Sequence, residues 1–321
     1  MLAPILEVLP LSIRGLVESL PSRVYESLEE IRVRQGSPLE VATPFHSMFL
    51  SPSGQVVTRE REGYRPDRED CQKMLNLVSR HSLYALEEEL RRGYVTIRGG
   101  HRIGLSGRVV VEAGKVKHIR DVTGFNLRVA RQVKGVARRL LSRILPGGQL
   151  ENILIVSPPQ CGKTTLLRDL TRIVSAGETI PSRKVGVVDE RSEIAGCVEG
   201  VPQHDVGPRT DVLDGCPKAE GMMMLIRSMS PELLVVDEIG RREDGEAVFE
   251  AVHAGVSLFT TAHGSSMEEV CRRPGIAQLV REGVFTRYIL LSRKQGPGTV
   301  EAIYDRGLNP VQESGVVKTG C

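Results

Sequence analysis

The chain has 321 residues, of which 40% are hydrophobic and 26% are charged. With a mean hydropathy of -0.13, this composition is typical of a globular protein and excludes an intrinsically disordered chain. No segment approaches the ~20 consecutive apolar residues that a membrane-spanning helix needs, and the first segment lacks the basic start of a signal peptide. The six cysteines fall singly, which favours free thiols in a reducing cytosol over a disulfide framework.

Charge is distributed unevenly along the chain. Residues 1–145 contain 24 Lys and Arg against 16 Asp and Glu, whereas residues 146–321 contain 19 against 24. Within the first half, residues 91–143 hold 14 basic side chains and only two acidic ones, Glu112 and Asp121. This asymmetry predicts a surface that faces the phosphates of a nucleic acid, of membrane headgroups or of a nucleotide. A solvated basic face without a ligand is the alternative.

The first half of the chain predicts a smaller, mixed α+β domain over residues 1–145. Short helices are expected over 1–20, 21–30, 67–79 and 83–93, and short strands over 30–35, 39–43 and 47–50. The alternating, glycine-punctuated segment 94–119 predicts a β-meander. A basic helix over 135–145 is expected to close this domain, and Pro146-Gly147-Gly148 marks the boundary.

The second half, residues 146–321, alternates short apolar runs with helical patterns. Strands are expected over 152–157, 184–190, 232–239 and 257–263, helices over 164–174, 219–229 and 243–255, and a terminal strand pair over 285–293 and 299–305. Buried strands that alternate with helices predict a largely parallel sheet with helices on both faces, and therefore an α/β domain. Residues 307–321 are expected to form a frayed tail.

The strongest motif follows the first of these apolar strands. It fits the P-loop pattern G-x-x-x-x-G-K-[ST], with Ser in place of the first Gly. In such a loop, backbone N–H groups surround the β-phosphate, and the positive end of the next helix points at the same charge. The sequence therefore predicts an ATP site with Mg²⁺, made by Ser157, Pro158, Pro159, Gln160, Cys161, Gly162, Lys163, Thr164 and Thr165. Lys163 is expected to reach the β- and γ-phosphates, and the Thr164 hydroxyl to bind Mg²⁺.

Two further strands end in carboxylates. The run at 233–236 is followed by Asp237 and Glu238, which are expected to hold Mg²⁺ and to polarise the attacking water. The segment 187–193 places Glu190 at the end of another strand, where it would face the γ-phosphate alongside Glu238. The spacing does not decide which of the two glutamates is the catalytic base.

A histidine and several arginines complete the candidate residues. His263 closes a strand that is expected to lie beside the strand of Asp237, where it can sense the γ-phosphate. Three arginines of the first domain are candidates to reach the nucleotide as arginine fingers: Arg120, Arg128 and Arg131. Three others are either phosphate contacts or surface charges: Arg209, Arg241 and Arg242.

These segments together resemble a known family. SPPQCGKTT, VVDERSEI, RSMSPELLVVDEIGR and TTAHG look like the corresponding segments of the stage III sporulation protein AA family, relatives of the type II and type IV secretion and pilus ATPases. The resemblance covers the second domain and extends into the first through 107–137. It implies a RecA-like domain whose Walker A, Asp, Walker B and His boxes fall on Lys163 and Thr164, on Glu190, on Asp237 and Glu238, and on His263.

The resemblance also implies an assembly and a biological setting. Such ATPases usually form hexameric rings in which arginines of the N-terminal domain meet the nucleotide, and the sporulation family is thought to power a channel complex between mother cell and forespore. Secretion ATPases often have Gly at the position of Asp237, so the acidic pair in this chain looks more like an ordinary Walker B.

The sequence thus predicts a cytoplasmic Mg²⁺-dependent ATPase that reaches the membrane through channel proteins and assembles as a homo-oligomer. The alternative is a RecA-like nucleic-acid motor, since residues 91–143 are basic. That segment offers only Tyr94 and Phe125 for base stacking, so nucleic acid is the less favoured partner. A nucleotide switch without hydrolysis is a third reading, against which the intact Lys163, Asp237 and Glu238 argue.

Overall fold

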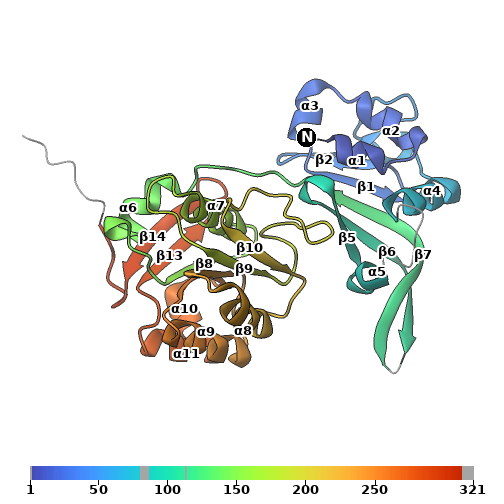
Figure 1. Cartoon of the computed structure of the whole chain (residues 1–321). Helices are drawn as coiled ribbons and strands as arrows, with labels where there is room; N and C mark the ends of the chain where they lie inside the picture. Colours follow the sequence, from blue (N-terminus) through green and yellow to red (C-terminus); the bar gives the residue numbers. More distant parts are fainter. Residues whose placement is uncertain (1, 80–86, 113, 313–321) are drawn as a thin grey trace, which may run out of the picture. The chain divides into compact units, whose positions relative to one another are not determined.

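The computed structural model describes residues 2–79, 87–112 and 114–312, and the chain divides into two compact units, Met1–Arg131 and Gln132–Cys321 (Figure 1). This division lies before the boundary that the sequence suggested at Pro146. Residues 132–145 belong with the second unit because apolar side chains of this segment, such as Leu140 and Ile144, are buried in its core.

The first unit contains short helices and one sheet. Its helices are α1 (Ala3–Glu7), α2 (Leu11–Glu18), α3 (Ser22–Ser27), α4 (Arg68–Val78) and α5 (Glu87–Arg92). Its strands are β1 (Glu30–Arg34), β2 (Glu40–Ala42), β3 (Ser47–Leu50), β4 (Val56–Val57), β5 (Tyr94–Ile97), β6 (His101–Glu112) and β7 (Lys115–Arg128). The helix expected over 83–93 is described only from Glu87, and its first residues lie outside the described range.

All strand pairs of this sheet are antiparallel, in the order β4-β3-β2-β1-β7-β6-β5. The last three strands form the predicted meander. Alternation along β1 buries Ile31 and Val33, which pack with Met74 of α4 and with residues of α1 and α2. Helix α4 begins with a capping box in which the Asp67 side chain accepts the Asp70 N–H and Asp70 accepts the Asp67 N–H.

The second unit alternates strands and helices. Its strands are β8 (Ile153–Ser157), β9 (Val185–Asp189), β10 (Thr210–Asp214), β11 (Leu233–Val236), β12 (Ser257–His263), β13 (Arg287–Ser292) and β14 (Thr299–Asp305). Its helices are α6 (Leu141–Ile144), α7 (Lys163–Ala176), α8 (Lys218–Met229), α9 (Arg242–His253), α10 (Met267–Cys271) and α11 (Pro274–Arg281).

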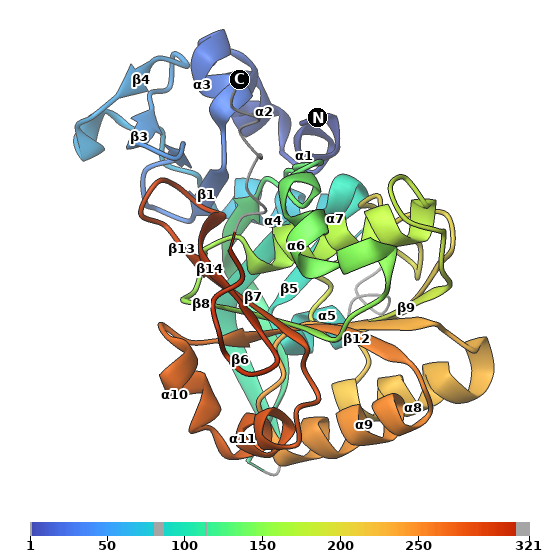
Figure 2. The ribbon, with the colours of Figure 1, turned by 90° about the vertical axis from the view of Figure 1, so that its left-hand side faces the viewer.

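The strand order of the second sheet is β10-β9-β11-β12-β8-β13-β14, with every pair parallel except β13–β14. Successive residues of β8 point to opposite faces. Ile153 and Ile155 join a core with α6 and α7, whereas Leu154 and Val156 join a second core with α8, α9, α10 and α11. Figures 1 and 2 show these helices on the two faces of the sheet, as the sequence predicted.

Three parts of the second unit differ from expectation. The helix expected over 135–145 begins later, as a 3-10 turn (Arg138–Leu140) followed by the short α6, because Gly135 has a left-handed backbone (φ 84°) that a right-handed helix excludes. The Gly135 and Ala137 N–H groups donate to the Asp169 side chain. Strand β10 was not predicted. The tail expected to fray from 307 is bound as far as Val311, whose N–H donates to the Ile303 carbonyl (2.8 Å), and its remainder from 313 lies outside the described residues. Among the helices of the described residues, none is long and apolar enough to cross a membrane.

Candidate functional site

The P-loop lies between the end of β8 and the start of α7. Gly162 caps α7 in the left-handed conformation (φ 87°), and a Cβ there would lie 3.2 Å from the Gly298 nitrogen. The Gly298 N–H in turn donates to the Cys161 carbonyl (2.9 Å), so the β13–β14 turn packs directly against the loop. Gln160 is also left-handed (φ 58°), which is uncommon for a residue with a side chain. The local geometry therefore requires Gly at 162 and tolerates strain at 160.

The parallel sheet gathers the predicted site residues at one edge. Strands β9, β11, β12 and β8 are neighbours that run in the same direction, so their carboxyl ends lie together. These ends carry Asp189, Asp237, His263 and Ser157. Ligands of open α/β sheets bind outside this edge.

Asp237 lies between two threonines, with its side chain partly buried. Thr164 Oγ1 donates to Asp237 Oδ2 at 3.0 Å, and Thr261 donates to the other carboxylate oxygen. Burial, followed by the nearby charge of Glu238, raises the pKa of Asp237 above its ordinary value despite these hydrogen bonds. The carboxylate thus occupies an environment that disfavours its negative charge, which a cation would relieve.

Lys163, His263 and Glu238 form a chain of contacts beside this carboxylate. Lys163 Nζ lies 3.1 Å from His263 Nδ1, and His263 Nε2 lies 2.6 Å from Glu238 Oε1. Arg191 Nη1 donates to the second Glu238 oxygen at 2.9 Å. Burial lowers the pKa of Lys163, although the charges of Glu238 and Asp237 oppose this effect. Glu238 itself has a left-handed backbone (φ 53°), a strained conformation of the kind that clusters at functional sites.

The loop after β9 is held by buried polar contacts. Asp189 accepts the N–H groups of residues 193–195 at 2.8–3.0 Å, and Arg168 of α7 donates to the Ile194 carbonyl. This anchoring places Glu190 in a narrow cleft that is also lined by Asp237 and Glu238. Glu190 pairs there with Lys218. The two glutamates proposed as alternative bases thus face the same cleft but have different partners.

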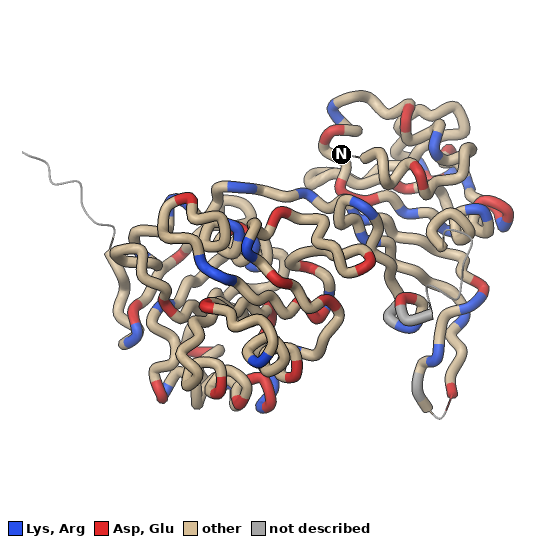
Figure 3. The backbone as a smooth tube through the Cα atoms, in the orientation of Figure 1, with Lys and Arg blue, Asp and Glu red and all other residues tan. Residues whose placement is uncertain are grey.

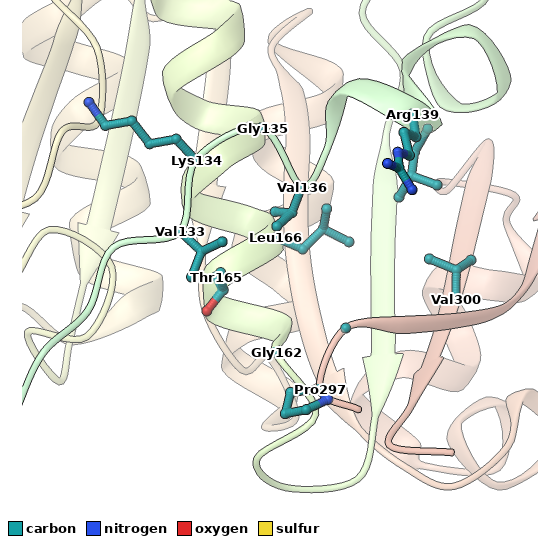
Figure 4. Close-up of a pocket in the computed structure, with 12 residues that line it drawn as sticks. Val133, Lys134, Gly135, Val136, Arg139, Gly162, Thr165, Leu166, Pro297 and Val300 are labelled. Carbon is teal, nitrogen blue, oxygen red and sulfur yellow. The ribbon is translucent and has the colours of Figure 1, made fainter. Parts of the chain in front are cut away.

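A larger pocket lies on the other side of the P-loop, with a volume of about 520 Å³. It is lined by Gly162, Thr165 and Leu166 from the P-loop and α7, by the β13–β14 turn, and by Val136 and its neighbours in the segment 133–140. Figure 4 shows Val136 and Leu166 close together and Lys134 extending away from them. The volume falls within the range of small-molecule sites, roughly 300–1,000 Å³.

The predicted arginines have other partners in the structure. Within the first unit, Arg120 lies 3.6 Å from Asp121, and Arg131 donates to the carbonyls of Glu26 and Leu28. In the second unit, Arg209 donates to the Ser182 carbonyl at 2.9 Å and Arg242 pairs with Glu246, whereas the Arg241 backbone N–H donates to Asp244 at the start of α9. The side-chain contacts of Arg209 and Arg242 are of the kind that the surface-charge alternative expects.

Three contacting residues were not assigned a role from the sequence. Thr261 binds Asp237, and its Oγ1 also accepts the Glu238 N–H at 2.9 Å. Arg191 and Lys218 hold the two glutamates. Thr261 lies two residues before His263 on a strand whose neighbour was foreseen, so period-two alternation could have found it. Nothing in the sequence links Lys218 to Glu190, because they belong to different elements.

The donors present fit one divalent cation. Within the described residues, no three His, Cys, Asp or Glu side chains gather as a metal-binding group. Mg²⁺ is usually held by one or two carboxylates together with substrate phosphates and waters, so it does not need such a group. The Thr164 hydroxyl and the Asp237 carboxylate, in contact at 3.0 Å, are oxygen donors of this kind.

Comparisons with known proteins place the chain in a family. The family described as sporulation stage III, protein AA matches residues 3–309. Stage III sporulation protein AA of Bacillus subtilis (strain 168) is 49% identical over 316 residues, which cover 98% of this chain and 99% of that protein.

Solved structures confirm the predicted fold, a RecA-like P-loop domain with a smaller mixed α+β domain. The Yersinia pseudotuberculosis ATPase DotB matches with a TM-score of 0.60 at 12% identity, covering 92% of this chain and 79% of that chain. The pilus retraction motor PilT, solved with bound ADP, matches with a TM-score of 0.55 at 17% identity, covering 84% and 76%. The family match over nearly the whole length decides the relationship: the chain belongs to the sporulation stage III protein AA family.

Proposed function

We propose that this protein is a Mg²⁺-dependent ATPase. The observation that carries the proposal is the convergence of Lys163, Thr164, Asp237 and Glu238 at the carboxyl edge of one parallel sheet, with Thr164 and Asp237 in contact at 3.0 Å. A P-loop lysine, a hydroxyl and carboxylate pair for Mg²⁺, and a second carboxylate nearby are the parts that phosphoryl transfer to water requires.

Each residue has a separate task in the proposed reaction. The Lys163 ammonium and the N-terminus of α7 bind the β- and γ-phosphates and offset their charge. Mg²⁺, held by Thr164 and Asp237, supplies further neutralisation of the phosphate oxygens when bound. Glu238 orients the attacking water and accepts its proton. Its carboxylate contacts the His263 ring, and the same ring contacts Lys163, so Glu238 lies near the group that binds the phosphates. His263 contacts both Lys163 and Glu238, so binding of the γ-phosphate by Lys163 changes the contact between His263 and Glu238.

Glu190 is the alternative base. Both glutamates have a cationic partner, but Lys218, which pairs with Glu190, is 11% exposed, whereas Arg191, which pairs with Glu238, is 62% exposed, so Glu190 is the weaker candidate. A carboxylate that is already paired with a buried ammonium is a poorer proton acceptor, because the cation stabilises its charged form. Lys218 is largely buried in this pair.

The pocket beside the P-loop supports a nucleotide rather than a simple polyphosphate as ligand. It shares Gly162 and Thr165 with the phosphate site, and valine and leucine side chains supply much of its wall. A purine base and ribose would find an apolar environment there while the phosphates contact the P-loop.

The names of the relatives support a proposal for the assembly and the biological role. DotB and PilT are named as an ATPase and a pilus retraction motor, and the family is named for sporulation. We therefore propose a homo-oligomeric, hexameric ring that works in the cytoplasm on membrane-embedded channel proteins. Capture of this protein from membranes of the native host, with and without ATP, tests that role. Recovery that depends neither on the membrane nor on ATP would contradict it.

The enzymatic proposal is tested by phosphate release from ATP by the full chain, with Mg²⁺ and with EDTA. Release is expected only with Mg²⁺. The variant Thr164→Ala should lower the rate at limiting Mg²⁺, whereas Thr210→Ala, at the first residue of the edge strand β10, serves as a matched control. Absence of both ATP binding and phosphate release at millimolar Mg²⁺-ATP would overturn the proposal.

A further inference from the structure

Helix α7 carries a buried carboxylate that the proposed reaction does not use. Asp169 lies beyond the P-loop on the face of the helix that also presents Leu166, three residues earlier. Only 1% of its side chain is exposed. A carboxylate so deeply buried is costly unless it is fully hydrogen-bonded, so its partners explain its presence.

The partners of Asp169 are two backbone N–H groups of another segment and the guanidinium of Arg172. Its Oδ1 accepts the Gly135 N–H at 3.0 Å, and its Oδ2 accepts the Ala137 N–H at 2.9 Å. Arg172, one turn further along α7, donates to Oδ1 at 2.9 Å. Burial opposes the charge of Arg172, but hydrogen bonds to Glu178 and Asp169 outweigh it and raise the pKa of Arg172.

The segment that Asp169 holds is a wall of the pocket beside the P-loop. Val136 lies between the two residues whose N–H groups are bound, and half of the lining residues come from 133–140 (Figure 4). Val136 itself is 39% exposed, so packing alone does not fix it. The opposite wall, at Thr165 and Leu166, belongs to α7. One carboxylate therefore ties the two walls together.

We infer that Asp169 is a positioning residue for the nucleoside part of the nucleotide. It sets the width of the pocket between Val136 and Leu166 and does not touch the phosphates. This inference rests on the proposed function, since it takes the pocket to hold the base and ribose of ATP. It predicts that Asp169 controls affinity for a nucleotide but not for a bare polyphosphate.

Asn is an informative substitution for Asp169, because it removes one hydrogen bond and keeps the size of the side chain. Both carboxylate oxygens accept an N–H group, and Asn can accept with only one oxygen. Its amide nitrogen would face a backbone N–H, so one of the two bonds to the segment is lost while the size of the side chain stays the same. The pocket wall should loosen without a cavity forming in the core.

The experiment compares two ligands on the full chain by calorimetry: ADP, and inorganic tripolyphosphate, which has no base. Asp169→Asn is expected to weaken ADP binding about tenfold and to leave tripolyphosphate binding within about twofold. Arg138→Ala is the control. It removes only the exposed pair with Glu178 and should leave both affinities unchanged.

Three outcomes separate the possibilities. Equal loss of both ligands in a folded Asp169→Asn, or no loss of either, would overturn the positioning role. If that variant does not melt cooperatively, Gly135→Ala replaces it, because φ at Gly135 is +84° and the site has space, so the segment is strained without disturbing the core. ADP binding alone should then fall. A wild-type protein that binds neither ligand would instead refute the proposed function.

Discussion

The ammonium of Lys163 lies 3.1 Å from Nδ1 of His263, so the lysine of the P-loop and the histidine of the neighbouring strand are in direct contact. The other ring nitrogen of His263 lies 2.6 Å from Glu238. A single imidazole therefore bridges the proposed phosphate-binding group and the proposed base. A phosphate that draws Lys163 away would change the contact that orients Glu238, which is the basis of the sensing role proposed for the histidine.

Lys163→Ala is expected to abolish ATP hydrolysis while the fold is retained. The side chain is buried in the site, and burial lowers its pKa, so the folded state gains little from keeping this charge. Phosphate release, measured on the same samples as thermal melting, checks the loss of hydrolysis, and the melting curve checks that the fold is retained. Lys73→Ala, at an exposed position of the first unit, is the control and should keep full activity. Undiminished turnover in Lys163→Ala would refute the P-loop assignment.

Glu238→Gln and Glu190→Gln separate the two candidate bases. Both are expected to slow hydrolysis while ATP binding is kept, with a loss of about 10²-fold or more for Glu238→Gln and a smaller one for Glu190→Gln. The difference follows from the partners, since Glu238 contacts His263 and the exposed Arg191, whereas Glu190 is paired with the largely buried Lys218. Single-turnover rates and ATP affinity are measured for both, with the exposed Glu246→Gln as control. A larger loss for Glu190→Gln would reverse the assignment.

The sequence predicted the central sheet well because its strands are continuous apolar runs that helices bury on both faces. It did not predict β10, whose five residues Thr210–Asp214 include two aspartates at an edge of the sheet, where polar side chains remain solvated. It also predicted one helix over 135–145. The carboxylate that accepts the first N–H groups of this segment, Asp169, looks in the sequence like an ordinary polar position of a helix.

The site followed the same division. Lys163, Thr164, Asp237 and His263 could be predicted to lie near one another because each stands at a fixed place relative to a strand end. The contacts between them depend on strand order, which one sequence does not reveal. The pairing of Glu190 with Lys218 joins residues 28 apart in different elements, and no periodicity encodes it.

Asp237→Asn is expected to stabilise the nucleotide-free protein while it impairs Mg²⁺-dependent hydrolysis. Burial raises the pKa of Asp237, so keeping this carboxylate charged at neutral pH lowers the free energy of unfolding. The hydroxyls of Thr164 and Thr261 can each donate or accept, so Asn keeps them hydrogen-bonded.

Melting temperatures measured with EDTA and with Mg²⁺-ADP check this trade-off. Asp237→Asn should melt a few degrees higher than wild type in EDTA and gain less from Mg²⁺-ADP. Asp211→Asn, an exposed carboxylate on β10, is the control. A variant that melts lower in EDTA would show that the carboxylate is needed for folding.

Tyr64→Phe is expected to make the free energy of unfolding fall less steeply as the pH rises into the alkaline range. The Tyr64 hydroxyl donates to Asp70 at 2.6 Å, and burial, followed by this bond to Asp70, raises the pKa of Tyr64 to about 12. The ordinary pKa is about 10, so the folded state holds the proton more tightly. The contribution of Tyr64 is therefore complete below pH 10 and is lost as pH rises towards 12.

Urea unfolding at several pH values measures how the free energy of unfolding changes with pH. Between about pH 10 and 12 the free energy of unfolding should fall more steeply in wild type than in Tyr64→Phe. Between pH 7 and 9 the two proteins should show the same slope, which serves as the internal control. Parallel curves across the alkaline range would mean that Tyr64 titrates alike in the folded and unfolded states.

The arginines of the first unit decide between the two motor classes. Figure 3 shows basic positions along the β6–β7 hairpin, and Arg120 and Arg128 there are both exposed. If they meet nucleotide phosphates across a ring, Arg120→Ala and Arg128→Ala should reduce ATPase activity when no nucleic acid is present. Arg131→Ala should do so as well, and its melting temperature must be followed because Arg131 also binds two backbone carbonyls.

The alternative class, a nucleic-acid motor, predicts an affinity for DNA that depends strongly on salt. A nucleic-acid motor would bind DNA through these same charges, and its affinity would fall steeply with salt because each neutralised phosphate releases condensed counterions. Base stacking would add about 1–3 kcal/mol per base, but the basic segment 91–143 holds only Tyr94 and Phe125. Filter binding of single- and double-stranded DNA at two salt concentrations is therefore expected to show weak, non-saturating binding that leaves the ATPase rate unchanged. Micromolar or tighter DNA binding that stimulates hydrolysis, together with unaffected DNA-free rates in the arginine variants, would establish the nucleic-acid motor instead.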